Sequence, residues 1–179
     1  MTAAPRMIPD TLVTWYLAMT DRAQFVPAWA DETEAISILE MREPDVAYYR
    51  FLYDGVGEVF GWRDRRLMSD KELFSAISAS HIRIFVMYVN GVPGGYFELG
   101  RYPDHTQIEY FGLRPHLHGR GLGKHLLSET IAKAWEMGGD QVWVHTCNLD
   151  SESALPNYLK RGFQIIRTEE EPMPDRYRV

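Results

Sequence analysis

The chain has 179 residues, of which 45% are hydrophobic and 13% aromatic, enough for one domain whose core needs neither disulfides nor metal ions. Its net charge of −6 argues against a nucleic-acid-binding protein, which needs a basic face to neutralise phosphates. Cys147 is the only cysteine, no stretch has the roughly 20 apolar residues of a membrane span, and no apolar signal segment opens the chain, so we expect a cytoplasmic protein without a membrane partner.

The amino-terminal part of the chain predicts two strands followed by two helices. Residues 11–19 mix β-branched and aromatic side chains, which is typical of a strand, and a weaker strand pattern follows at 34–41. Apolar side chains at helical spacing predict a helix that begins near residue 46, and the glycines at 55, 57 and 61 are expected to end it and to start an aromatic loop. A Ser-x-x-Glu capping box at Ser69 predicts a second helix that ends near residue 78.

The remainder of the chain predicts an antiparallel run of strands and then alternating helices and strands. Asn90-Gly91 is a hairpin signal between two strands, although Pro93 is expected to shift the turn. The resulting order, β-β-α-α-β-β-β-α-β-α-β, predicts an α/β (α+β) domain in which helices flank a mixed, mostly antiparallel, twisted sheet. The predicted strands in this part are 82–89, 92–100, 107–113, 141–146 and 163–168, and the predicted helices are 121–137 and 153–161.

Three glycines occur at alternate positions, 119, 121 and 123, where the long helix is predicted to start. A turn needs one or two glycines, so three indicate a loop whose main-chain N–H groups converge on one anion, most simply a phosphate. The spacing differs from a Walker loop, because the residue after Lys124 is His125 where Ser or Thr is needed. It also differs from the G-x-G-x-x-G dinucleotide fingerprint, because glycine is missing at positions 124 and 126.

The stretch from His118 to Gly123 resembles the acyl-CoA pyrophosphate loop of the GNAT superfamily of N-acetyltransferases, Gln/Arg-x-x-Gly-x-Gly/Ala, with His118 where the family has Gln or Arg. Residues 151–163 resemble the family's Asn-x-x-Ala-x-x-x-Tyr-x-x-x-Gly-Phe, with Ser151 in place of Asn. The resemblance implies a single N-acetyltransferase domain over 1–179, with the acyl-CoA-binding core at about 82–168 and acceptor-side elements at about 11–78. It further implies that the sheet splays between the strands at 107–113 and 141–146.

The resemblance also implies acetyl-CoA as the co-substrate. Amides at the start of the long helix, where its dipole is positive, are expected to hold the diphosphate, and Arg120 and Lys124 add charge. Gly112 is expected to mark a bulge that opens strand pairing, so that main-chain groups of neighbouring residues bind the pantetheine arm. The expected acetyl-CoA-binding residues are Phe111, Leu113, His118, Gly119, Arg120, Gly121, Leu122, Gly123, Lys124 and Ser151.

Direct transfer of an acetyl group to an amine requires one group that gives a proton to the thiolate and another that removes a proton from the amine. The resemblance places the acid at Tyr158. Strand alternation puts Glu109 on the same face as Phe111, close to the expected splay, and makes it the preferred base. Glu98, His145 and ordered water are the alternatives.

The implied function is acetyl transfer from acetyl-CoA to a primary amine of a small molecule, in a ternary complex and without a covalent acyl-enzyme. A protein lysine or N-terminal acetyltransferase, or a non-catalytic CoA-binding sensor, would share the same motifs. A homodimer is one option for the assembly. The histidines and Cys147 match no zinc spacing, so no metal is expected. The acceptor is expected between the strand at 92–100 and the early aromatic segment, with Tyr49, Tyr53, Trp62 and Arg63.

Overall fold

The protein is represented by a computed structural model that describes residues 8–31 and 34–178. Its helices and strands follow one another in the predicted order, and within the described residues no helix has the length and apolarity to cross a bilayer. The strands are β1 (Thr11–Met19), β2 (Ile36–Glu40), β3 (Ile82–Val89), β4 (Val92–Arg101), β5 (His105–Leu113), β6 (Gln141–Cys147) and β7 (Gln164–Pro172). The helices are α1 (Val46–Gly57), α2 (Asp70–Ile77), α3 (Leu122–Glu136) and α4 (Ala154–Lys160).

The seven strands form one mixed sheet in the order β2-β3-β4-β5-β6-β1-β7. Every neighbouring pair is antiparallel except β5 and β6, which run parallel. That parallel ladder is short, because it joins His105–Ile108 only to Gln141–Val144. Beyond Ile108, β5 keeps β4 on one side and diverges from β6 on the other, so the predicted splay is confirmed.

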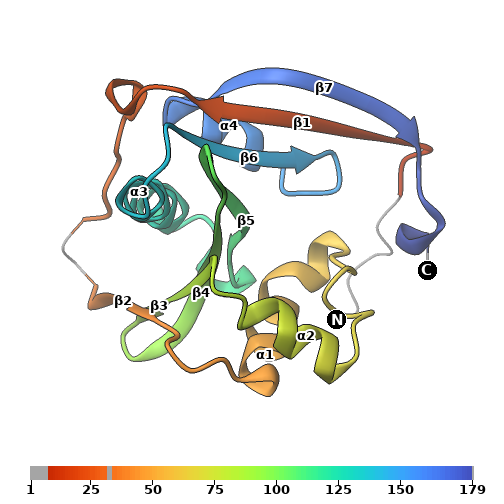
Figure 1. The fold of residues 1–179 in the computed structure, drawn as a ribbon, viewed down its shortest axis with the longest axis horizontal. Coiled ribbons are helices and arrows are strands. Elements are labelled where there is room, and N and C mark those ends of the chain that lie inside the picture. The colour runs from red at the N-terminus through yellow and green to blue at the C-terminus, as the bar shows by residue number, and fades with distance from the viewer. Residues whose placement is uncertain (1–7, 32–33, 179) are drawn as a thin grey trace.

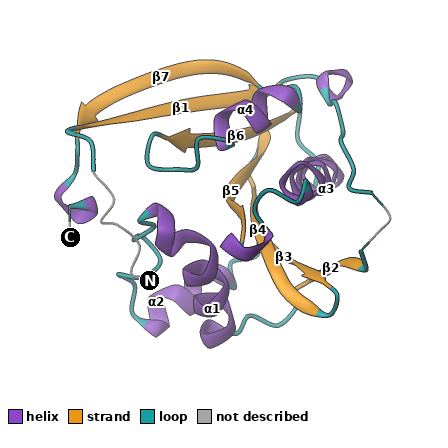
Figure 2. Ribbon diagram, turned by 180° about the vertical axis from the view of Figure 1, so that it is seen from behind, coloured by secondary structure: helices purple, strands orange, loops and turns teal. Residues whose placement is uncertain are grey.

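Helices cover both faces of the sheet, and each face has its own core. Figure 1 shows α3 on one side of β4 and β5 and the pair α1 and α2 on the other, and Figure 2 shows the same arrangement from behind. Leu126, Leu127 and Ile131 of α3 are fully buried against Phe97 and Leu99 of β4 in the larger core. The smaller core lies under α1 and α2 and is rich in aromatic residues.

Helix α1 ends at Gly57, one of the three glycines expected to end it. Gly57 also gives room to an indole, since a Cβ there would lie 2.3 Å from Trp62. The local expectation about Pro93 is wrong. The hairpin turn stays at Asn90-Gly91, with left-handed φ values of 52° and 81°, and Pro93 does not displace it. The irregularity appears instead within the strands, between Met87 and Tyr88.

The expected bulge in β5 is present, but Gly112 does not form it. Glu98 pairs with Tyr110 and Leu99 with Ile108, so Glu109 is the extra residue in the ladder. The lack of a side chain at Gly112 has a different cause, since a Cβ there would lie 2.4 Å from Val56 of α1. Gly112 therefore lets α1 pack close to the sheet beside the splay.

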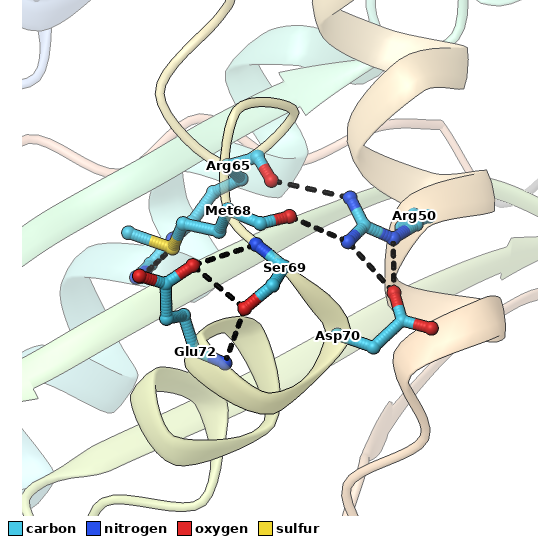
Figure 3. Close-up of polar contacts among 6 residues, drawn as sticks. All are labelled: Arg50, Arg65, Met68, Ser69, Asp70 and Glu72. Carbon is cyan, nitrogen blue, oxygen red and sulfur yellow. Dashed lines mark hydrogen bonds and ion pairs between the residues drawn. The ribbon is translucent and has the colours of Figure 1, made fainter.

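The segment between α1 and α2 is fastened to both helices. Ser69 and Glu72 form the predicted capping box, in which the Ser69 amide donates to the Glu72 carboxylate at 2.8 Å and the Ser69 hydroxyl accepts from the Glu72 amide. Arg50 of α1 donates to the carbonyl oxygen of Met68 at 2.8 Å and pairs with Asp70 at 2.9 Å, as Figure 3 shows.

A buried ion pair fixes the same segment to the sheet. The Arg65 guanidinium lies 2.5 Å from the carboxylate of Glu98 in β4, which has no exposed surface, and the Tyr49 hydroxyl donates to the other carboxylate oxygen. Burial raises the pKa of the Glu98 carboxyl, while Arg65 acts in the opposite direction. Arg65 therefore offsets part of the rise in pKa that burial of the Glu98 carboxyl causes.

Replacing Arg65 with methionine is expected to lower the free energy of unfolding by about 3–5 kcal/mol near pH 8, because Glu98 is left buried without its counter-charge. The pKa of Glu98 in the folded state would then rise further above its unfolded value. Below the folded pKa the carboxyl is neutral and costs little, so the loss should shrink at pH 5 and grow as the pH rises. Urea denaturation of both proteins at the two pH values measures this.

The control is Arg66→Met, which removes a partly exposed ion pair with Asp54 and should cost no more than about 1 kcal/mol at either pH. An Arg65→Met loss of the same size at pH 5 and pH 8 would contradict the assignment of a charged Glu98.

Candidate active site

A cavity of about 580 Å³ opens at the splay. Residues of β5 and of the glycine loop form one part of its wall, and β6, α4 and the turn between them form another. The segment that follows α1 closes the remaining side with Phe60, Trp62 and Arg63. The cavity therefore lies where the two halves of the sheet separate, and it reaches the start of α3.

Two residues of β5 present their main-chain groups to the gap. The Arg114 amide donates to the carbonyl oxygen of Gly94 in β4 at 2.8 Å, so Gly112, two residues earlier, also faces β4. Phe111 and Leu113 alternate with Gly112 and Arg114 along the strand, so their main-chain N–H and C=O groups point away from β4. On the side away from β4, no strand among the described residues pairs with Phe111 or Leu113. Both residues line the cavity.

The glycine loop supplies a run of unpaired amides. Among residues 8–31 and 34–178, no main-chain or side-chain acceptor takes a hydrogen bond from the amides of Gly119 and of residues 121–124. Gly119 and Gly121 have left-handed φ values of 79° and 74°, which a residue with a side chain adopts only at a cost. The first turn of α3 adds the positive end of the helix dipole, so the loop forms a site for an anion.

The side chains around this loop differ in what they contact. Lys124 is exposed and its side chain lies close to Gly121, since a Cβ at Gly121 would be 3.6 Å from the Lys124 Cε atom. His118 lies in the cavity wall and contacts the Leu113 carbonyl oxygen through Nε2 at 3.1 Å. Arg120 instead pairs with Glu34, and Leu122 is buried in the core. Lys124 and His118 thus line the cavity, whereas the described cavity wall includes neither Arg120 nor Leu122.

Ser151 lines the cavity at the turn before α4. Its hydroxyl lies 2.9 Å from that of Ser153 and accepts from the Ser153 amide at 3.3 Å. Ser151 therefore orders the turn that leads into the helix carrying Tyr158.

Tyr158 lies on α4 and its side chain is almost fully buried in the cavity wall. Its ring centroid is 6.1 Å from that of Phe111, which brings it to the splay. Burial, with a smaller contribution from the Asp150 carboxylate, raises the pKa of the phenol well above its ordinary value. The hydroxyl is therefore protonated at neutral pH and available as a proton donor.

Glu109 also lines the cavity, but on the face of the sheet opposite to the one that strand alternation predicts. A Cβ at Gly100, which shares a face with Glu98, would lie 2.6 Å from the Glu109 carboxylate. The expectation that Glu109 shares a face with Phe111 is therefore wrong, because the bulge at Glu109 interrupts the alternation. The carboxylate accepts from the Tyr102 hydroxyl at 2.7 Å and from Gln107 at 3.2 Å.

The two alternative bases differ in exposure. Glu98 is enclosed by Arg65 and Tyr49 and does not line the cavity, so it has no path to an acceptor. His145 of β6 is exposed, lines the cavity and packs against Tyr16 with ring centroids 5.8 Å apart.

The acceptor side agrees only partly with the expectation from sequence. Tyr53, Trp62 and Arg63 line the cavity, whereas Tyr49 is core and the described cavity wall includes no residue of 92–100. The rings of Tyr53, Trp62 and Tyr110 form a cluster with centroids 5.2–5.4 Å apart.

Two residues that the motifs leave unspecified connect the walls of the cavity. The Asp150 carboxylate accepts from the Trp62 indole at 3.2 Å and from the Thr146 hydroxyl at 2.6 Å, and so joins the segment after α1 to the end of β6. Asn157 donates to the Gly123 carbonyl oxygen at 3.2 Å and ties α4 to the glycine loop. Among the described residues, no three His, Cys, Asp or Glu side chains are grouped as metal ligands.

Comparison with known proteins agrees with this geometry. The family model described as Acetyltransferase (GNAT) family matches residues 48–163. A search of curated protein sequences gives no match. A GCN5-related N-acetyltransferase from Sphaerobacter thermophilus has a TM-score of 0.65 and 17% identity, over 92% of this chain and 52% of that one, so the present chain spans about half its length.

Two shorter proteins of known structure are also similar. An aminoglycoside acetyltransferase from an uncultured soil metagenomic sample has a TM-score of 0.58 and 19% identity, over 70% of this chain and 86% of that one. The ribosomal-protein-S18-alanine N-acetyltransferase from Escherichia coli has a TM-score of 0.58 and 17% identity, over 73% and 78%. At these identities the similarity establishes the fold, and the family follows from the matched model: the chain belongs to the GNAT acetyltransferase family.

Proposed function

We propose that this chain transfers an acetyl group from acetyl-CoA to a primary amine of a small molecule. The observation that carries the proposal is that three features line one cavity. They are the loop residues Gly119, Gly121, Gly123 and Lys124 with their unpaired amides, the main chain of Phe111 and Leu113 on the side away from β4, and the buried phenol of Tyr158. The cavity volume of about 580 Å³ is in the range of small-molecule sites. With a single cysteine in the chain, we place this activity in the cytoplasm.

The loop has open space beside two of its glycines. A Cβ at Gly119 would meet no atom within 4 Å, and at Gly121 only the flexible Lys124 side chain comes near. The amides and Lys124 would hold the diphosphate of acetyl-CoA, while Phe111 and Leu113 would bind the pantetheine arm as an added strand does. The Leu113 carbonyl oxygen is already occupied by His118, so Leu113 has its amide to offer.

When bound, acetyl-CoA supplies an acetyl group activated as a thioester. Amine attack forms a C–N bond and breaks the C–S bond; the nitrogen loses a proton and the departing sulfur gains one. Tyr158 would give its phenolic proton to the sulfur, and Glu109 would accept the proton of the amine, directly or through water. An outward-facing amide of Phe111 or Leu113 would donate to the carbonyl oxygen as negative charge develops there.

Tyr158→Phe keeps the ring and removes only the hydroxyl. We expect turnover to fall by about 10²- to 10⁴-fold, since a general acid contributes about that much, while acetyl-CoA affinity stays near normal. The assay measures free CoA thiol released from acetyl-CoA over a panel of small amines, lysine peptides and peptides with free amino termini, and calorimetry gives the affinity.

Wild-type turnover with small amines supports the proposed acceptor class, and turnover with peptides alone would replace it with a protein substrate. Acetyl-CoA binding without turnover on any amine would point to a sensor. Unchanged turnover in Tyr158→Phe would remove Tyr158 from the mechanism.

Glu109→Gln tests the base. The amide keeps the shape of the side chain but cannot take up the proton, so we expect turnover to fall by about 10²-fold or more without a change in acetyl-CoA affinity. His145→Gln, at the alternative base that also lines the cavity, is the matched comparison and should stay within a few-fold of wild type. A loss confined to His145→Gln would reverse the assignment.

A further inference from the structure

Arg161 carries a buried positive charge that has no counter-charge among the described residues. It is the residue directly after α4, and only 9% of its surface is exposed. Its Nε atom has no hydrogen-bond partner, and its closest polar contact is from Nη1 to the Asn157 side chain, at 3.5 Å. Across residues 8–31 and 34–178, no carboxylate forms an ion pair with it.

Such a side chain is costly unless something else compensates it. Arginine stays protonated in proteins, so Arg161 cannot lose its charge to suit an apolar surrounding. A buried charge without a partner destabilises the folded chain, and buried charges in proteins are normally paired. Arg65, the other largely buried arginine near the cavity, follows this rule by pairing with Glu98. Arg161 is therefore the exception that requires an explanation.

The backbone holds Arg161 in one place. Its carbonyl oxygen accepts from the Val26 amide at 3.0 Å, and the following Gly162 has a left-handed φ of 106°. A Cβ at Gly162 would lie 1.8 Å from the Gln24 carbonyl oxygen, so the turn is tightly enclosed. The end of α4 is thus anchored to the segment after β1, and the Arg161 side chain starts from a fixed point.

Asn157 links Arg161 to the first turn of α3. Arg161 and Asn157 are four residues apart and share a face at the end of α4. Asn157 in turn donates to the carbonyl oxygen of Gly123, in the glycine loop. Arg161 lines the same cavity as that loop.

We propose that Arg161 binds a phosphate group of the acyl-CoA co-substrate and that this anion is the partner its buried guanidinium lacks. The inference rests on the proposed function, because it assigns a further binding residue to the same cavity. Acyl-CoA carries phosphate in two places, the diphosphate and the 3′-phosphate of the ribose. A planar guanidinium suits either, since it donates two parallel hydrogen bonds to phosphate oxygens.

The experiment measures the affinity of Arg161→Leu and wild type for acetyl-CoA and for acetyl-3′-dephospho-CoA by calorimetry, together with the thermal midpoint of each protein without ligand. Arg161→Leu should bind acetyl-CoA about 10- to 100-fold more weakly, as expected for the loss of charged hydrogen bonds. Its midpoint without ligand should be equal to or higher than that of wild type, because an unpaired buried charge has been removed. A residue with a purely structural role would lower the midpoint and leave affinity unchanged.

The two ligands identify the phosphate. A loss of equal size with both assigns Arg161 to the diphosphate, and a loss that disappears with the dephospho form assigns it to the 3′-phosphate. A change below about twofold with both ligands overturns the proposal. Arg42→Leu, at an exposed arginine outside the cavity, is the control and should bind as wild type does.

Arg161→Gln provides a second neutral variant if the leucine protein does not fold, and the same loss is expected of it. Wild-type protein that fails to bind acetyl-CoA would defeat the proposed function itself. Wild-type binding with unaffected Arg161 variants defeats only the present inference.

Discussion

The site depends on main-chain polar groups that the fold leaves unpaired. Strands β5 and β6 separate after Ile108, and α3 begins with amides that have no acceptor among the described residues. Such groups are costly when buried, so they must face water or a ligand. That ligand must pair with β5 as a neighbouring strand would, and must accept hydrogen bonds from the first amides of α3 as a preceding helical turn would. An extended arm that ends in a diphosphate satisfies both, because the arm can pair with β5 while the diphosphate meets the amides. The same two openings are thus what the fold contributes to binding.

Packing keeps these openings in place. Gly112 and Gly57 have no side chains at the points where Val56 and Trp62 approach, so α1 and the segment after it lie close to the diverging strands. Asp150 then ties Trp62 to the turn after β6, across the cavity. Two buried arginines differ in their partners. Arg65 pairs with Glu98 within the core, whereas Arg161 lines the cavity and has no carboxylate partner among the described residues.

Local sequence signals predict the order of the elements and the position of the loop, because capping boxes, hairpin signals and glycine spacing act within a few residues. The face of the sheet on which the Glu109 side chain lies could not be predicted in this way, because it depends on a bulge that the register between β4 and β5 produces. The partners of Glu98, Asp150 and Arg161 likewise come from distant segments, and the motif containing Arg161 leaves its position unspecified. Gly112 was noticeable as a glycine in a strand, yet only the packing of Val56 explains it.

The proposed function requires the free amides of the glycine loop to bind the diphosphate of acetyl-CoA. Nuclear magnetic resonance of ¹⁵N-labelled protein, titrated with acetyl-CoA, observes those amides one by one. We expect the signals of Gly119, Gly121 and Gly123 to shift together and to saturate with the same affinity, along with that of Leu113. Saturable binding that leaves the three glycine signals unmoved would contradict it.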